Sequence, residues 1–126
     1  MIRLVHLFTG ADGQSHFEEG NAPMVPPGLA VDPSRKAPAT TIYFEESAAG
    51  SSLDWHNDPH RRYVITLTGT VEFETRVGQT FTLFPGDILL AEDATGGGHR
   101  WRLVGNRPWC RVYVDIPSED SDAGAT

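Results

Sequence analysis

The stretch GSSLDWHNDPHRRYVITLTG at residues 50–69 is followed by FPGDILLAEDATGGGH at residues 84–99. Each stretch combines a short run of aliphatic and β-branched residues with a polar segment that is rich in Gly, Pro, Asp or Asn. Short apolar runs bounded by such residues are typical of β-strands that are joined by turns. Each stretch also carries at least one histidine close to a carboxylate residue, so both stretches bear on chemistry as well as on fold.

Similar short runs continue on both sides of these stretches. They recur at roughly 8–12-residue intervals with Gly-rich breaks between them, and no window carries the period of an amphipathic helix. A further apolar run, Ile2–Phe8, predicts an N-terminal strand. We therefore predict an all-β sandwich or barrel of antiparallel strands. Its seven main strands are predicted at Thr40–Glu45, Tyr63–Thr68, Val71–Thr75, Thr80–Phe84, Ile88–Ala91, His99–Val104 and Arg111–Ile116.

The spacing of residues in the two quoted stretches resembles the two motifs of the cupin superfamily. The first family motif is a glycine, five residues, His-x-His, three or four residues, a glutamate, six residues and a glycine. Here five residues separate Gly50 from His56, and six separate Arg62 from Gly69. The second family motif opens with Pro-Gly-Asp, as residues 85–87 do here, and closes with a histidine on the next strand.

The closing histidine of the second motif corresponds to His99, and the resemblance covers residues 40–116. It implies a single-domain double-stranded β-helix, which is a jelly-roll barrel, with a pocket inside and usually with a homodimeric assembly. It does not imply one reaction, because the same fold carries enzymes of several classes and plain binding proteins.

The chain divides into three predicted parts. Residues 1–38 form an N-terminal strand and a proline-rich arm that packs on the barrel, since five prolines lie between positions 21 and 40. Residues 39–117 form the barrel. Residues 118–126, which are acidic and poor in apolar side chains, form a disordered tail.

The predicted strand Tyr63–Thr68 is apolar on both faces, with Tyr63, Ile65 and Leu67 on one and Val64 and Thr66 on the other. A strand with one solvated face alternates more cleanly. We therefore expect the outer face to be covered, either by the proline-rich arm or by a second subunit. Val71–Thr75 alternates strictly, which predicts that Glu72 and Glu74 lie in solvent.

The resemblance also points to a metal site, although the sequence departs from the family pattern there. Metal-binding cupins use two histidines and a glutamate from the first motif and one histidine from the second. Such a set suits Fe, Mn, Ni, Cu or Zn. Here His56 and His99 keep two of the positions, whereas Asp58 stands in the second histidine position and Arg62 in the glutamate position. Arginine is a donor-only cation and cannot be a metal ligand.

Three hypotheses remain open. In the first, His56, His99 and either Asp58 or His60 hold a divalent metal, in a set that resembles the facial triad of non-haem iron enzymes. Arg62 then orients an anionic group of the substrate. The activity would be that of an oxygenase, isomerase or lyase acting on a small aromatic or carboxylated molecule.

In the second hypothesis the site is metal-free, and the protein is a small-molecule binding protein or an isomerase. Arg62 anchors a carboxylate, while His56 or His99 transfers protons. In the third, the pocket only binds a ligand or has lost its function. In every case the predicted centre is His56, Arg62 and His99, with Val64, Thr66 and Trp101 on the wall of the substrate pocket.

The amino-acid composition limits the kinds of molecule that the protein is expected to bind. Ten basic and seventeen acidic residues give a net charge of −7, which disfavours nucleic acid and anionic membrane surfaces. One cysteine, Cys110, excludes an intramolecular disulfide and is predicted to be a buried core thiol. The N-terminus lacks the apolar segment of a secretory signal, and no stretch is apolar enough to span a bilayer. A cytoplasmic protein with a small-molecule ligand is the resulting expectation.

Overall fold

The protein is built from β-strands. The computed structural model describes residues 1–30 and 36–117, and these residues contain ten strands and no helix. In that part of the chain, accordingly, no helix has the length and apolar character needed to cross a membrane. The predicted tail, residues 118–126, lies outside the described residues. The strands are β1 (Arg3–Thr9), β2 (Ser15–Asn21), β3 (Thr41–Ser47), β4 (Ser52–His56), β5 (Arg62–Thr68), β6 (Thr70–Thr75), β7 (Thr80–Leu83), β8 (Ile88–Ala91), β9 (His99–Val104) and β10 (Trp109–Asp115).

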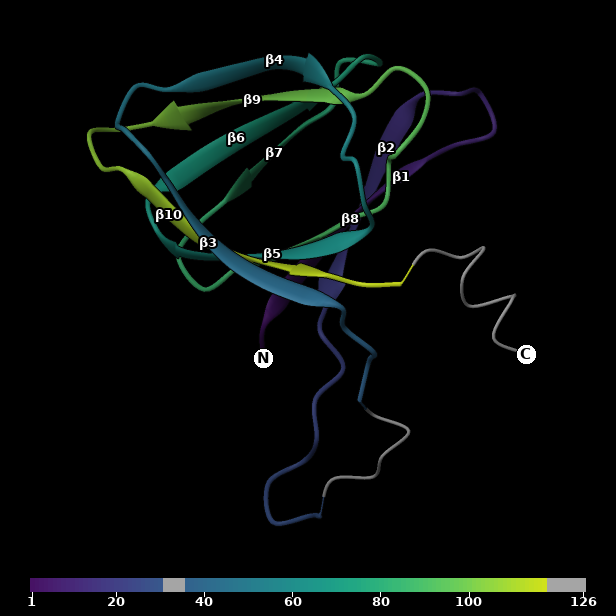
Figure 1. Cartoon of the computed structure of the whole chain (residues 1–126), viewed down its shortest axis with the longest axis vertical. Helices are drawn as coiled ribbons and strands as arrows, with labels where there is room; N and C mark the ends of the chain where they lie inside the picture. Colours follow the sequence, from purple (N-terminus) through teal and green to yellow (C-terminus); the bar gives the residue numbers. More distant parts are fainter. Residues whose placement is uncertain (31–35, 118–126) are drawn as a thin grey trace.

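The strands form two facing sheets (Figure 1). The order is β2-β1-β8-β5-β10-β3 in the six-stranded sheet and β4-β9-β6-β7 in the four-stranded sheet. From β3 onward the pairing is nested, because β3 pairs with β10, β4 with β9, β5 with β8 and β6 with β7, all antiparallel. This pattern is one long hairpin wound into a barrel, and it defines the jelly roll, the fold that cupins share. The predicted all-β jelly-roll fold is confirmed.

All seven strands predicted for the barrel are present, but two further strands were missed. The strand β4 and the strand β2 are short and polar, with sequences SLDWH and SHFEEGN, and neither carries a run of β-branched residues. β2 forms a hairpin with β1, and β1 extends the six-stranded sheet by pairing with β8 in parallel. The hairpin therefore belongs to the barrel wall.

The hydrophobic core lies between the two sheets. It consists of the inward-facing residues of both sheets, and Leu7, Val71, Leu83 and Leu89 are at most 1% exposed. Between β5 and β6 the chain passes through Gly69, which adopts a φ of 87°. A Cβ on Gly69 would lie 2.5 Å from the carbonyl oxygen of Pro108, which explains why this motif position requires glycine.

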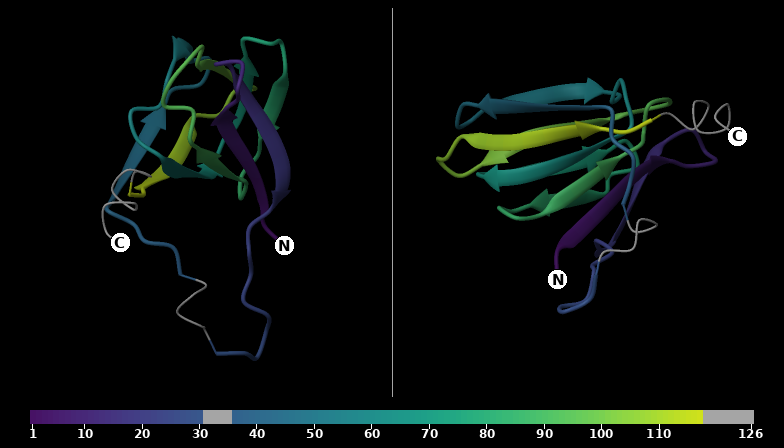
Figure 2. Two further views of the ribbon diagram at one scale, coloured as in Figure 1. Left: turned by 90° about the vertical axis from the view of Figure 1, so that its right-hand side faces the viewer. Right: turned by 60° about the horizontal axis from the view of Figure 1, so that its bottom comes forward.

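The proline-rich arm differs from its prediction. Residues 23–30 and 36–40 are exposed or half-buried, and they lead away from the barrel rather than along it (Figures 1 and 2). Leu29, for example, is 66% exposed. The arm therefore does not cover the outer face of β5. Cys110 also differs from its prediction, because it lies half-buried on the outer face of β10 and its thiol donates to Glu46.

Candidate functional site

Two histidines and one aspartate meet at one end of the barrel. His56 ends β4, His99 begins β9, and the two residues are direct partners in the antiparallel pairing of these strands. Their rings lie 4.4 Å apart between centroids. Asp58 follows β4 by two residues and joins them, so that one ligand atom from each of the three side chains lies within 4.8 Å of the others.

The close approach of the two histidines depends on the residue before His99. Gly98 has a φ of 74°, and the space that a side chain would occupy there is filled by the backbone of His56. Any other residue at position 98 would push β9 away from β4. The last glycine of the Gly96–Gly98 run therefore has a direct role in building the site.

The ring orientation of each histidine is fixed by a partner at Nδ1. His99 Nδ1 lies 2.5 Å from Oδ2 of Asp93, and the same oxygen accepts the hydroxyl of Ser15 at 2.6 Å. These three residues are at most 1% exposed. His56 Nδ1 lies 2.8 Å from the backbone carbonyl of Asp54.

A carbonyl or a carboxylate oxygen accepts, so Nδ1 carries the hydrogen in both rings, and in the neutral form of each ring Nε2 carries the lone pair. In this tautomer Nε2 can bind a metal ion while Nδ1 donates to a carboxylate or a carbonyl, which is the usual arrangement of a metal-binding histidine.

The third side chain, Asp58, has one oxygen engaged and one without a hydrogen-bond partner. Arg62 donates to Oδ1 at 2.9 Å, and the Oδ2 atom is buried and unpartnered among the described residues. Oδ2 lies 3.8 Å from Nε2 of His99. Burial raises the pKa of the Asp58 carboxyl above its ordinary value, while the nearby His99 and Arg62 act in the opposite direction. A buried oxygen of this kind is costly unless it meets a proton or a cation.

The donor set fits a divalent metal ion. Two imidazole nitrogens and one carboxylate oxygen form the facial set that transition metals accept with open positions remaining. Two ligands at about 2.1 Å from one ion lie about 3.0 Å apart in a facial octahedral set and about 3.4 Å apart in a tetrahedral one. The 3.8 Å between Asp58 and His99 and the widest separation, up to 4.8 Å, both have to contract when an ion binds.

A cavity of about 190 Å³ opens beside the three residues, inside the barrel. Aromatic rings make up much of its wall, and two arginines, Arg62 and Arg111, lie among them. Val64 and Trp101 are among the residues that line it. The rings are those of Tyr43, Phe73, Trp101, Trp109 and Tyr113.

Arg62 occupies the centre of the predicted site, although not as an isolated cation. Besides Asp58 it donates to the hydroxyl of Tyr43 at 2.7 Å, and its guanidinium lies 4.3 Å from the ring centre of Tyr113. Its Nε is buried and has no hydrogen-bond partner in residues 1–30 and 36–117. The Arg62 side chain is one of those that line the cavity.

Arg111 was not predicted from the sequence. It is 3% exposed, packs 4.0 Å from the ring centre of Trp109, and pairs with Glu45 at 2.8 Å. Its Nε donates to the hydroxyl of Tyr113, whose pKa burial raises. The sequence did offer a signal for Arg111. Side chains alternate between the two faces of a strand, so Arg111 shares the inward face of β10 with Trp109 and Tyr113.

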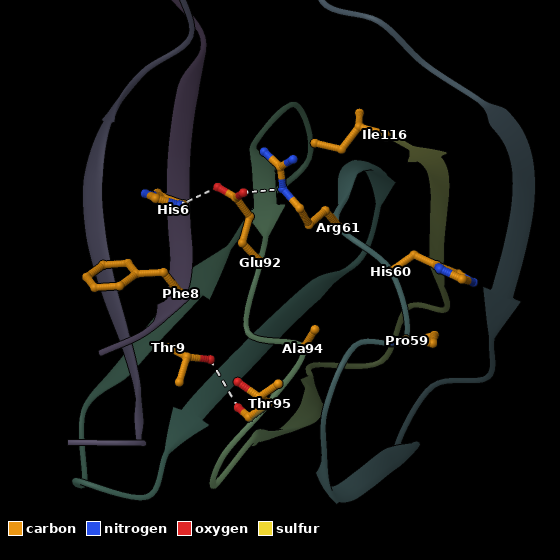
Figure 3. A pocket seen from close by; sticks show the side chains of 10 residues that line it. All are labelled: His6, Phe8, Thr9, Pro59, His60, Arg61, Glu92, Ala94, Thr95 and Ile116. Carbon is orange, nitrogen blue, oxygen red and sulfur yellow. Dashed lines mark hydrogen bonds and ion pairs between the residues drawn. The ribbon is translucent and has the colours of Figure 1, made fainter. Parts of the chain in front are cut away.

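Two predicted site residues lie elsewhere. His60 is exposed and lines a different hollow, together with His6, Arg61 and Glu92 (Figure 3). It therefore does not join the metal-ligand group, which takes Asp58 instead. Thr66 is completely buried and accepts a hydrogen bond from Nε1 of Trp109 at 3.2 Å. Because it lies behind that ring, Thr66 supports the cavity wall without lining the cavity.

Fold and site together define a jelly-roll barrel with a His/His/Asp group that is able to hold a metal ion. Among solved structures, the chain is similar to a cupin superfamily protein of Desulfitobacterium hafniense. The two share 13% sequence identity with a TM-score of 0.46, and the match covers 79% of this chain and 100% of that one. No family model and no curated protein sequence matches the chain. The description of the fold therefore rests on the strand pairing.

Proposed function

We propose that the protein is a divalent-metal-dependent enzyme that acts on a small carboxylated molecule inside the barrel. The metal would be held by Nε2 of His56, Nε2 of His99 and Oδ2 of Asp58. One observation carries this proposal: both Nδ1 atoms are held by acceptors of the chain itself, while the unpartnered oxygen of Asp58 lies beside His99 Nε2.

A bound divalent ion would supply a Lewis acid with open coordination positions. The chain's own residues supply binding and orientation. The guanidinium group of Arg62, which lines the cavity, would donate to a substrate carboxylate, and charge-assisted hydrogen bonds of this kind are among the stronger ones. The aromatic wall excludes water from the other side of the substrate, which strengthens these contacts.

The charge of the cavity favours an anionic substrate. On the cavity wall Asp58 pairs with Arg62 and Glu45 pairs with Arg111, so these two carboxylates and two guanidinium groups sum to zero. A divalent ion would raise the sum to +2, which an anionic substrate would lower.

The size of the cavity limits the substrate further. A volume of about 190 Å³ lies below the range of about 300–1,000 Å³ that is usual for ligand pockets. A single small ring or a short-chain acid fits this space, whereas a nucleotide or an oligosaccharide exceeds it.

The metal-free alternative is supported by one contact. Arg62 already neutralises Asp58 at 2.9 Å, so the cluster is not forced to bind a cation in order to balance charge. In that case the protein is a binding protein or an isomerase, in which Arg62 anchors the ligand and a histidine moves the proton. Arg62→Leu should then abolish calorimetric binding of small carboxylates to metal-free protein.

Calorimetric metal titration distinguishes the two functions. Protein without a histidine tag is stripped of metal and titrated with Mn²⁺, Fe²⁺, Ni²⁺, Cu²⁺ and Zn²⁺. We expect one site per chain that is lost in His56→Ala and in His99→Ala and kept in the matched control His60→Ala. Wild-type protein that takes up none of the five ions would overturn the proposal, and so would equal affinity in all four proteins.

A further inference from the structure

The cavity inside the barrel reaches solvent between two edge strands. β3 is the outermost strand of the six-stranded sheet, and β4 is the outermost strand of the four-stranded one. Glu45 on β3 and Leu53 on β4 line the cavity and are exposed, whereas its other lining residues, all in the described part of the chain, are buried or half-buried. The mouth of the cavity therefore lies between Glu45 and Leu53.

Glu45 at this mouth is paired with a buried arginine. Glu45 and Arg111 are direct partners in the antiparallel pairing of β3 with β10, and Nη2 of Arg111 donates to Oε2 of Glu45 at 2.8 Å. The Glu45 side chain is 51% exposed and the Arg111 side chain 3%. The ion pair thus joins a carboxylate that stays in contact with water to a guanidinium group that does not.

Arg111 does not depend on Glu45 for its position. Its Nε donates to the hydroxyl of Tyr113 at 3.0 Å, while Nη1 donates to Oγ of Ser47 at 2.8 Å and to the backbone carbonyl of Trp109 at 3.2 Å. Within residues 1–30 and 36–117, Glu45 is the one carboxylate that an ion pair joins to Arg111. If Glu45 turned into solvent, Arg111 would remain on the cavity wall with Nη2 lacking its acceptor.

The two partners of this ion pair differ in what they lose on separation. A buried guanidinium group without a carboxylate is costly, whereas a half-exposed carboxylate is well solvated on its own. Glu45 is therefore readily replaced on Arg111 by another anion, but not by nothing. A carboxylate inside the cavity is shielded from water, so it attracts Arg111 more strongly than the half-exposed Glu45 does.

The same exchange would enlarge the cavity. Its volume of about 190 Å³ is small for a ligand pocket, and Glu45 is one of the two exposed side chains that bound it. A Glu45 side chain that turns outward leaves the mouth and frees the space beside Arg111. Replacement of one carboxylate by another also leaves the charge of the site unchanged.

A second position for an anion is present on the same wall. Arg62 and Arg111 lie against one ring, that of Tyr113, with their guanidinium carbons 4.3 Å and 5.4 Å from its centre. Both arginines line the cavity. A small molecule with an anionic group at each end is therefore able to contact both of them at once.

We propose that the ligand of this cavity is a small dicarboxylate, and that one of its carboxylates replaces Glu45 on Arg111. The other carboxylate then faces Arg62 and the His/His/Asp group. The inference rests on the proposed binding of a carboxylated molecule inside the barrel, and it specifies the number of carboxylates. Glu45 becomes a specificity-determining residue, because a molecule with one carboxylate cannot replace it and also contact Arg62.

Calorimetry with succinate and with butyrate, which has the same chain length and one carboxylate fewer, tests this inference. Wild-type protein should bind succinate at least about 10-fold more tightly than butyrate, since succinate makes one more charge-assisted contact. Glu45→Gln keeps the size of the side chain but removes the charge that competes for Arg111. It should bind succinate about 10-fold more tightly than the wild type does, and its exposed position allows the change without loss of the fold.

The matched control is Glu46→Gln, the next residue along β3, which accepts from the Cys110 thiol instead of from Arg111. It removes the same charge from the chain and should leave succinate affinity at the wild-type level. Four results would overturn the inference. They are equal affinity in the two variants, weaker binding in Glu45→Gln, no preference of the wild type for succinate over butyrate, and no binding of either acid.

The titrations are run on metal-free and on Zn²⁺-treated protein, so that failure of the metal site is recognised separately. Zn²⁺ uptake without a preference for succinate would contradict the dicarboxylate ligand and leave the metal site standing. A preference for succinate in protein that takes up no Zn²⁺ would do the reverse.

NMR of the side chains adds a measurement that needs no variant. Saturation of the wild-type protein with succinate should shift the guanidinium nitrogen resonances of Arg111 and move the carboxylate carbon resonance of Glu45 to that of a solvated carboxylate. Unchanged resonances of both residues at saturation would show that the ligand does not replace Glu45.

Discussion

Asp93 is predicted to set the metal affinity of the site without being a ligand. It is completely buried, and its Oδ2 atom accepts from both Ser15 and His99. In Asp93→Asn the amide can keep the two hydrogen bonds through its oxygen, which leaves its NH₂ in a buried position where Oδ1 has no partner. If the amide turns instead, its NH₂ faces His99 Nδ1 and forces the hydrogen of the ring onto Nε2.

Either arrangement weakens metal binding. In the first, a charged acceptor becomes a neutral one, and charge-assisted hydrogen bonds are roughly twice as strong as neutral ones. In the second, the lone pair of Nε2 is lost. Removing the outer partner of a metal-binding histidine typically costs 10–100-fold in affinity, which corresponds to about 1.4–2.7 kcal/mol. We therefore expect the dissociation constant of Zn²⁺ to rise by about 10–100-fold.

The assay combines calorimetry with nitrogen NMR of the histidine rings in metal-free protein. The ring nitrogens report the tautomer of His99 directly, which a general loss of stability would not change. The matched control is Asp54→Asn. The exposed side chain of Asp54 accepts only from the backbone N–H of Trp55, whereas His56 is held by the backbone carbonyl of Asp54, which the substitution keeps. Wild-type affinity in Asp93→Asn together with an unchanged His99 tautomer would refute the reasoning.

Three further changes test other parts of the site. Thr66→Val leaves Nε1 of Trp109 without its acceptor and should lower the free energy of unfolding by about 1–3 kcal/mol, measured by urea denaturation. Stoichiometric metal binding should be unaffected. Loss of metal binding would show instead that Thr66 contributes to the binding site. Burial raises the pKa of Tyr113 above 10.0, so stability should fall as pH rises past that value, where the unfolded tyrosine ionises first. Tyr113→Phe should show a shallower fall in alkaline denaturation series, and an identical slope would contradict this. Arg62→Lys, which keeps the charge but loses the planar guanidinium, should weaken binding of a small carboxylate such as benzoate to metal-loaded protein by about 10-fold or more. If calorimetry gives the same affinity for the wild-type protein and for Arg62→Lys, Arg62 does not contact the substrate.

Much of the fold was predictable from the sequence because strong local signals marked it. Each strand with β-branched and aromatic residues was located, and the glycine at position 69 fits a backbone turn that excludes a side chain. The strands β2 and β4 gave no such signal. Their polar residues extend only because β1 and β9 pair with them, and pairing between distant segments is not visible in a local pattern.

The candidate site was predictable in part. Motif spacing identified His56 and His99, but it could not choose between Asp58 and His60, since both lie within four residues of His56. The choice is made by the turn after β4, which buries Asp58 and leaves His60 exposed. Asp93 was missed because its role depends on a loop that folds back against Ser15 of the N-terminal hairpin.

Titration of Zn²⁺ into histidine-labelled protein, followed by nitrogen NMR, tests the metal site most directly. The chain has five histidines, and each reports separately on its two ring nitrogens. The resonances of Nε2 in His56 and His99 should move to metal-bound positions at one equivalent, while Nδ1 in both stays protonated and His6, His16 and His60 do not change. Binding through His60, ligation through Nδ1, or no change at His56 and His99 would contradict the proposed centre.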